Sequence, residues 1–181
     1  PDEIKQLREQ AKQGKPQAQY LLALKLADGD GVKENTPEAM LWYQQAADNG
    51  FAPAQNNLAV LLADGHEAKS SKKSLAEKMK GLLPGKKETE APTGSADEQA
   101  VHWYRRSADR ENPHAQCNLG YRLATGKGVE QNAEEAVKWY RQATKQGHPL
   151  AMNNLGVMYA NGEGVEASER EAAKLFQQAA D

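Results

Sequence analysis

Apolar residues recur at spacings of three and four along most of the chain, which is the pattern of helices with one buried face. The stretch 115–151 shows it most clearly, with two such segments separated by Gly126-Lys127-Gly128. Two glycines allow positive φ there, so the chain can reverse sharply. The pattern therefore predicts a helix, a tight turn and a second helix. The apolar positions are Ala115, Leu119 and Leu123 in the first segment and Ala136, Trp139, Tyr140 and Ala143 in the second.

Helix boundaries are marked by capping residues. Asn132 precedes the second helix and Glu135 stands three residues later, as in a capping box. Asn35 with Glu38, and Ser168 with Glu171, repeat this arrangement. After a long insertion we expect Asp97 to cap the helix that follows.

The helix pair occurs four times. Ala18, Ala54, Ala115 and Ala151 open equivalent first helices, at spacings of 36, 61 and 36 residues. The longer spacing reflects an insertion of 25 residues in the second copy. A fixed period of this length is typical of a solenoid, in which each repeat packs only on its neighbours. The equivalent Trp42, Trp103 and Trp139 are expected in the core between repeats.

The predicted organisation is one solenoid domain of four helix pairs. A leading helix, or half-repeat, comes first, and a loop insertion interrupts the second repeat at about 66–96. We expect the fourth repeat, 150–181, to be truncated. The expected parts are 1–16 (leading helix), 17–52, 53–113, 114–149 and 150–181.

One motif resembles a known family. Ala151-Met152-Asn153-Asn154-Leu155-Gly156-Val157-Met158-Tyr159, Gly162-Glu163-Gly164-Val165 and Ala136-Val137-Lys138-Trp139-Tyr140 are similar to the Sel1-like repeat. The resemblance covers residues 4–181 apart from the insertion, and it implies an all-α, right-handed α-solenoid related to tetratricopeptide repeats. Members of the family look like bacterial adaptors that assemble protein complexes. A periplasmic or secreted location is favoured by this resemblance alone.

Composition narrows the classes of partner. The formal net charge is −2, so no overall attraction to nucleic acid is expected. No apolar run reaches the roughly 18 residues that span a bilayer. Cys117 is the single cysteine, so no intrachain disulfide forms. The chain begins at Pro1 without Met and shows no signal peptide, from which we expect a mature form or a fragment. We expect a monomer.

Candidate catalytic and metal motifs are weak. Ser70-Ser71-Lys72-Lys73 matches the Ser-x-x-Lys of penicillin-recognising enzymes, but the partner motifs are missing. Asp28-Gly29-Asp30-Gly31 lacks the later ligands of a calcium loop. The four histidines fall in different places, although His114 and Cys117 are three residues apart and could share a helix face. We therefore expect no catalytic residue, no metal and no cofactor.

A more informative pattern is a stripe that repeats along the first helices. Positions are counted from the alanine that opens each first helix, and Asn recurs at the fourth position. Spacings of three and four place the seventh and eleventh positions on the same helix face. First helices line the concave face of tetratricopeptide-type solenoids, so the stripe would line a groove. Asn amides there could pair with the backbone of an extended peptide, or each could satisfy a neighbouring helix end. The stripe contains Asn57, Asn118, Asn154, Val60, Tyr121, Val157, Asp28, Asp64 and Asn161.

The insertion carries a second candidate surface. It is a solvated loop, or it contains a short amphipathic helix over 74–83 that docks on the solenoid or on a partner. The candidate partner-binding residues of this arm are Leu75, Met79, Leu82, Leu83, Lys72, Lys73 and Lys78.

These features favour a non-catalytic scaffold that binds a peptide or protein segment in the concave groove. One alternative is an accessory or weakly hydrolytic factor in bacterial cell-wall metabolism, acting on β-lactam or peptidoglycan, as the family resemblance implies. Another is that the basic arm binds anionic lipid or nucleic acid.

Overall fold

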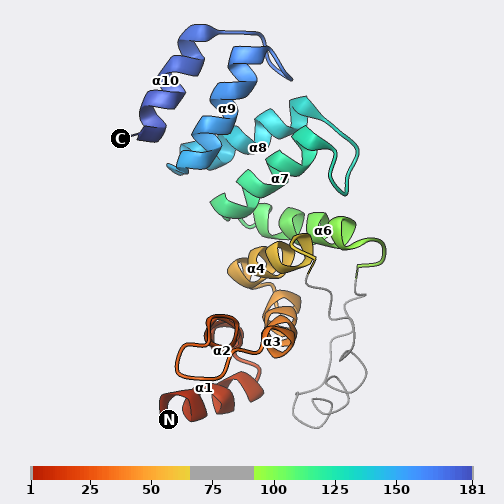
Figure 1. Ribbon diagram of the computed structural model, residues 1–181, viewed down its shortest axis with the longest axis vertical. Coiled ribbons are helices and arrows are strands. Elements are labelled where there is room, and N and C mark those ends of the chain that lie inside the picture. The colour runs from red at the N-terminus through yellow and green to blue at the C-terminus, as the bar shows by residue number, and fades with distance from the viewer. Residues whose placement is uncertain (1, 66–91, 181) are drawn as a thin grey trace. The chain divides into compact units, whose positions relative to one another are not determined.

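The computed structural model describes residues 2–65 and 92–180, and these residues form nine helices and no strand (Figure 1). The all-α architecture of helix-turn-helix pairs confirms the predicted fold class. The chain divides into two compact units, 1–92 and 93–181, and each is described by itself.

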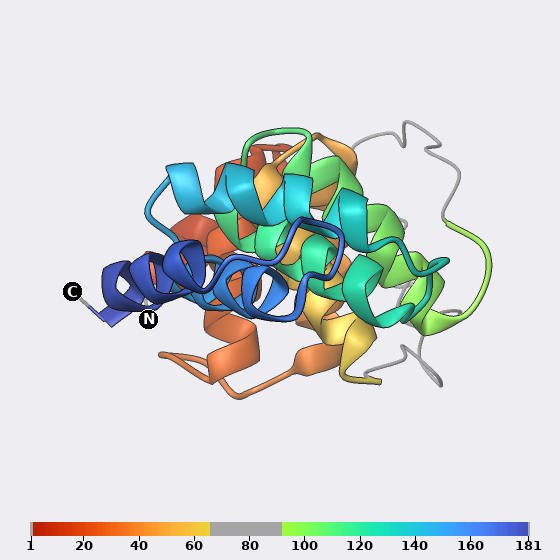
Figure 2. The ribbon, with the colours of Figure 1, turned by 90° about the horizontal axis from the view of Figure 1, so that it is seen from above.

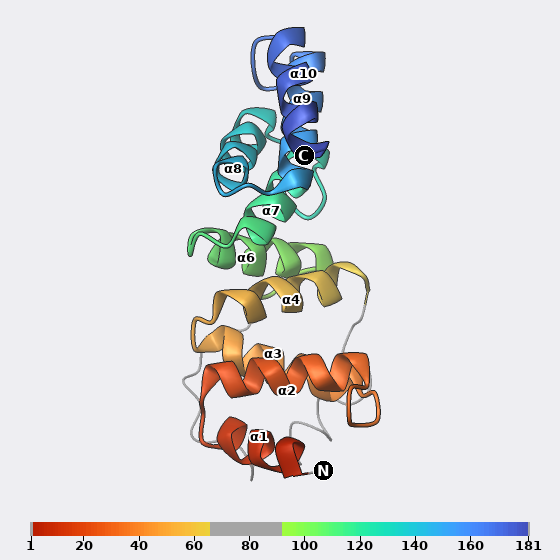
Figure 3. The same cartoon turned by 90° about the vertical axis from the view of Figure 1, so that its left-hand side faces the viewer.

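Unit one contains four of these helices. They are α1 (Asp2–Lys12), α2 (Pro16–Asp28), α3 (Thr36–Asp48) and α4 (Ala52–Ala63). Helix α2 packs against both α1 and α3, and α3 packs against α4 (Figure 3). Sequence-adjacent helices are therefore neighbours in space, as expected for stacked repeats.

Unit two contains the other five. They are α6 (Ala96–Ala108), α7 (Pro113–Thr125), α8 (Ala133–Lys145), α9 (Pro149–Asn161) and α10 (Glu169–Ala180). Each packs on the next along the chain, and α7 also contacts α9 directly. The loop that joins α9 to α10 is drawn in dark blue in Figure 2. That all copies form one solenoid stays a prediction.

The predicted caps begin the helices, with one correction. The side chains of Asn35, Asn132 and Ser168 accept hydrogen bonds from the backbone N–H three residues later. Helix α6, however, is capped by Ser95 rather than Asp97. The Ser95 hydroxyl accepts from the Glu98 N–H, and the Glu98 carboxylate accepts from the Ser95 N–H. Asp97 lies in the first turn, where its carboxylate pairs with the buried Arg122 guanidinium.

Two glycines of the α7–α8 turn serve different purposes. Gly126 ends α7 with a left-handed φ of 73°. Gly128 also has φ 73°, but in addition a Cβ atom there would lie 2.4 Å from the carbonyl carbon of Asp97. The turn of copy three is thus pressed against the first turn of α6. Gly164 repeats this contact one copy later, against the backbone of Ala133.

Glutamines that follow the first-helix alanine tie successive repeats together. Gln19, Gln55 and Gln116 are buried, and each Nε2 donates to a carbonyl eight residues earlier, at the end of the preceding helix. A buried carbonyl at a helix end needs such a partner. Gln recurs at this position in three copies, so the sequence contained a signal for this contact that was not used in the predictions.

The tryptophans are buried to different extents. Trp42 and Trp103 are 1% exposed, as predicted, whereas Trp139 is only half-buried. The indole Nε1 of Trp139 donates to Glu135 at 3.2 Å, and Arg105 pairs with the same carboxylate at 2.7 Å. The arrangement recurs in unit one among Trp42, Glu38 and Arg8.

Candidate functional site

The predicted stripe is accessible along the first helices of unit two. Tyr121 on α7 is 45% exposed, and Val157 on α9 is 46% exposed. Asn118 and Asn154 are half-buried, and Asn161 is exposed. Because α7 contacts α9, the structure places these two segments of the stripe on adjacent helices.

In unit one the same positions are accessible as well. Asn57 and Val60 on α4 are half-buried, and Asp64, which follows that helix, is exposed. Asp28, the last residue of α2, is also exposed. A ladder of Asn side chains through all copies stays a prediction, since its members belong to two separately described units.

Two Asn amides of the stripe are held by tyrosines of the preceding helix. The Asn57 Nδ2 donates to the Tyr43 hydroxyl at 3.4 Å. Asn154 likewise hydrogen-bonds to Tyr140, which also lies fourteen residues earlier, and its Nδ2 lies 3.9 Å from the Cys117 Sγ. The partners of these two Asn side chains are tyrosine hydroxyls, and not the helix ends that the second explanation supposed. Pairing with the backbone of a bound peptide stays a prediction, because an amide group has further donor and acceptor sites.

Burial keeps these tyrosine hydroxyls protonated. It raises the pKa of Tyr43 to about 12, with the hydrogen bond from Asn57 opposing the shift. The pKa of Tyr140 is also raised, again by burial first. Both hydroxyls are consequently neutral anchors for the amides at any physiological pH.

A close approach in each copy of unit two explains the glycine before the stripe's seventh position. A Cβ atom at Gly120 would lie 2.7 Å from the Tyr140 ring, and one at Gly156 would lie 2.7 Å from the Phe176 ring. The aromatic ring of the second helix is thus seated on the backbone of the first. This contact lets the two helices of each pair, α7 with α8 and α9 with α10, approach closely.

Cys117 does not have the properties of a nucleophile. Its side chain is 1% exposed, and burial raises the pKa of its thiol to about 11. A thiolate is the reactive form, so this cysteine is unreactive near neutral pH. His114 is directed elsewhere: its Nδ1 lies 3.0 Å from Nε2 of His148. The expectation that the histidines lie apart is therefore wrong for this pair, which stacking of copies three and four brings together.

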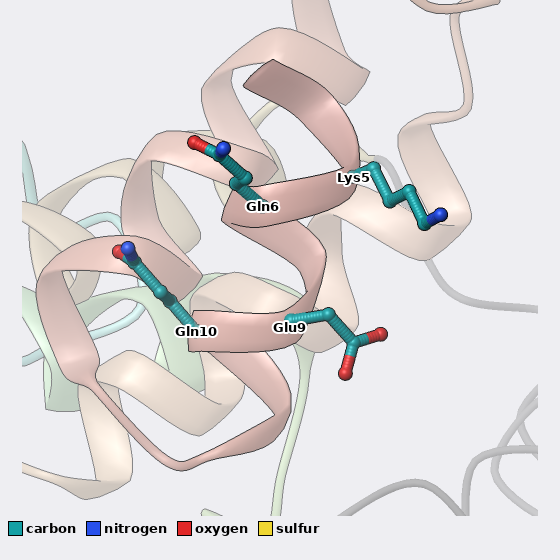
Figure 4. Close-up of a pocket in the computed structure, with 4 residues that line it drawn as sticks. All are labelled: Lys5, Gln6, Glu9 and Gln10. Atoms are coloured by element: carbon teal, nitrogen blue, oxygen red, sulfur yellow. The ribbon is translucent and has the colours of Figure 1, made fainter. Parts of the chain in front are cut away.

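The other surface features of the described residues are a shallow depression and scattered charged side chains. Figure 4 shows a shallow depression on α1, where Lys5 and Glu9 point one way and Gln6 and Gln10 another. Within residues 2–65 and 92–180, no three His, Cys, Asp or Glu side chains gather to hold a metal ion. Over the same residues, no helix has the length and apolar character needed to cross a membrane.

Several predicted residues lie outside the described part of the chain. They are Ser70 of the Ser-x-x-Lys match and the arm residues Leu75, Met79, Leu82, Leu83, Lys72, Lys73 and Lys78.

Comparisons with known proteins agree with the repeat pattern. The family model described as Sel1 repeat matches residues 16–51, 52–76, 95–112, 113–148 and 149–181. The crystal structure of a Sel1 repeat protein from Oxalobacter formigenes is similar, with a TM-score of 0.69 and 30% identity, covering 93% of this chain and 59% of that one. The structure of c5321, a protective antigen of uropathogenic Escherichia coli with an SLR fold, has a TM-score of 0.47 and 28% identity, covering 96% and 40%.

A bacterial relative is also similar in sequence. The uncharacterized protein NMB1327 of Neisseria meningitidis serogroup B (strain ATCC BAA-335 / MC58) is 29% identical over 125 residues, which are 69% of this chain and 20% of that protein. The chain thus spans about a fifth of this relative's length. Five matched segments, together covering most of the sequence in register with the helix pairs, show that the chain belongs to the Sel1 repeat family.

Proposed function

We propose that this chain is a non-catalytic scaffold that binds an extended peptide or protein segment along the first-helix stripe. Sel1 repeat proteins commonly serve as scaffolds for protein–protein interaction and are generally not enzymes. The observation that carries the proposal is the pair of half-exposed side chains Tyr121 and Val157, at equivalent positions of adjacent helices.

Single exposed apolar side chains are ordinary on protein surfaces. These two are different because they recur in register and because their helices are in contact. Leu21, on the same face of α2 in unit one, is 41% exposed. A partner segment that covers Tyr121 and Val157 would remove apolar surface from water, at about 25 cal/mol for each Å².

The anchored amides supply the polar part of the site. Tyr140 holds Asn154 before any partner arrives, so little side-chain entropy is lost when its remaining amide atoms bind. An amide donates and accepts at once, which suits the alternating N–H and C=O groups of a peptide backbone. Such a site binds an extended segment without demanding one sequence, while the apolar pair selects side chains.

A cation lies beside Tyr121. The Lys127 ammonium is 5.9 Å from the centre of the Tyr121 ring. A cation in this position leaves the exposed edge of the ring available while favouring an acidic side chain on the partner. We therefore expect bound segments to carry an apolar residue followed or preceded by Asp or Glu.

The test is a random-peptide display selection against the chain, followed by dissociation constants for an enriched peptide. Tyr121→Ser with Val157→Ser should raise the dissociation constant at least tenfold. Leu150→Ser is the matched control, because Leu150 is 55% exposed but lies outside the stripe, and it should change binding less than twofold. Equal losses in both variants, or a selection that enriches nothing, would refute the proposal.

No described residue favours the cell-wall alternative. Its one motif, at Ser70, lies outside the described part of the chain. Turnover of a chromogenic β-lactam that disappears in Ser70→Ala would nevertheless revive it.

A further inference from the structure

Two histidines meet where copies three and four of the repeat stack. His114 is in the first turn of α7, and His148 is the N-cap residue of α9. The two imidazoles are arranged edge to face, with ring centres 4.8 Å apart and the His148 Nε2 3.0 Å from the His114 Nδ1. Both rings are accessible enough to exchange protons with water, since His114 is exposed and His148 half-buried.

The contacts assign a single tautomer to each ring. Nδ1 of His148 accepts a hydrogen bond from the Ala151 N–H at 3.3 Å, so it carries no proton. The neutral ring is then protonated at Nε2, which donates to Nδ1 of His114. His114 therefore carries its own proton on Nε2. The N-cap hydrogen bond of α9 and the hydrogen bond between the two imidazoles therefore both require a neutral His148 ring.

An added proton has no place that preserves both contacts. On Nδ1 of His148 it removes the acceptor of the Ala151 N–H and puts a positive charge at a helix N-terminus, where the helix dipole disfavours it. On Nδ1 of His114 it sets two N–H groups against each other, unless His148 changes tautomer and again loses the cap. A metal ion between Nδ1 of His114 and Nε2 of His148 would meet the same obstacle, because it too requires the proton of His148 on Nδ1.

Neighbouring charged groups do not offset the free-energy cost of adding a proton to this histidine pair. For each imidazole, the titratable group that faces it in the described structure is the other imidazole. Glu111 and Lys145, three residues earlier in each case, form no ion pair with either ring among the described residues. Burial, and then the neighbouring His114, lower the pKa of His148.

We propose that His114 and His148 form a clasp of neutral imidazoles between copies three and four, and that acidification opens it. Opening frees the start of α9 from α7, and it uncaps α9 at the same time. The contact between α7 and the start of α9 is therefore pH-sensitive. This inference does not depend on what the stripe binds.

NMR of the full chain, labelled with ¹⁵N, tests the clasp. At pH 7.5 the His148 ring should show the Nε2–H tautomer, and acidification through the lowered pKa of His148 should shift the Ala151 amide proton out of its hydrogen-bonded position. In His148→Asn that shift should vanish, because Asn caps without titrating, as Asn112 does for α7 through the Ala115 N–H. His102→Asn, which alters a histidine outside the clasp, should behave as the parent chain.

A second variant, His114→Gln, keeps the proposal testable if His148→Asn does not fold. His114→Gln keeps an acceptor for the His148 Nε2–H but cannot be protonated, so the pKa of His148 should rise toward its ordinary value. The drop in thermal midpoint between pH 7.5 and 5.5 should be about 2–4 °C smaller in His148→Asn than in the parent chain. The Nδ1–H tautomer at His148, an Ala151 amide that ignores pH, or an equal thermal drop in His148→Asn would each overturn the proposal.

Discussion

Replacing Gly128 by alanine should destabilise unit two far more than replacing Gly147. Both glycines have left-handed backbones, with φ 73° and 77°. An alanine Cβ at 147 would meet nothing within 4 Å, whereas at 128 it would lie 2.4 Å from the Asp97 carbonyl carbon and 2.5 Å from its oxygen. Those atoms belong to the first turn of α6, so they cannot move away as a flexible side chain could.

The size of the effect follows from two terms. Left-handed backbone costs an alanine about 1–2 kcal/mol, and this term applies to both variants. Overpacking adds about 1–3 kcal/mol for Gly128→Ala alone. We therefore expect about 1–2 kcal/mol for Gly147→Ala and about 2–5 kcal/mol for Gly128→Ala. The second value is a large part of the typical stability of a small domain, about 5–15 kcal/mol.

Urea unfolding followed by circular dichroism measures the difference, with hydrogen exchange of α6 and α7 amides to assign it to unit two. Gly164→Ala, whose Cβ would lie 2.4 Å from the Ala133 carbonyl carbon, should repeat the larger loss. If Gly128→Ala lowers the free energy of unfolding by no more than Gly147→Ala does, the turn does not press on α6, and the reasoning is refuted.

Three further predictions concern titratable groups. The Arg105 guanidinium lowers the pKa of Glu135 below 4.5, so this pair stabilises the fold above that value and loses its effect as pH falls. Glu135→Gln should cost about 0.5–1 kcal/mol near neutral pH, allowing for its solvent exposure, and should flatten the acid limb of a stability–pH curve. Because the pKa of Tyr43 is raised from 10.0 to about 12, stability should fall between those values, and Tyr43→Phe should lessen the fall; an unchanged alkaline limb would contradict this. Cys117, buried with a thiol pKa of about 11, should react with a disulfide reagent at pH 8 only after urea is added, and immediate reaction of the native chain would be inconsistent with the structure.

Much of the fold could be predicted because the repeat multiplies weak local signals. A capping residue is a modest signal alone, but Asn35 and Asn132 with Glu three residues later mark the same boundary in two copies. Ser95 shows the limit of this reasoning. Ser and Asp are equally good caps, and in the structure Ser95 caps α6 while the Asp97 carboxylate pairs with Arg122, a contact between helices that helical spacing does not specify.

The candidate site was predictable as a surface but not in its contacts. Helical spacing placed Tyr121 and Val157 on one face, and the structure leaves both half-exposed. That a tyrosine of the preceding helix holds the Asn amide depends on how helices stack, which periodicity does not specify. The same is true of His114 and His148, which lie 34 residues apart.

The most direct test of the central claim maps a bound peptide onto unit two. Chemical shifts of the chain should be followed while an enriched peptide is titrated in. We predict that the side-chain amides of Asn118 and Asn154 and the backbone amides around Tyr121 and Val157 shift together, with the same affinity, while those of α10 remain unchanged. Shifts confined to other surfaces, such as the outer face of α1 or the region of Leu150, would contradict the assignment of binding to the first-helix stripe.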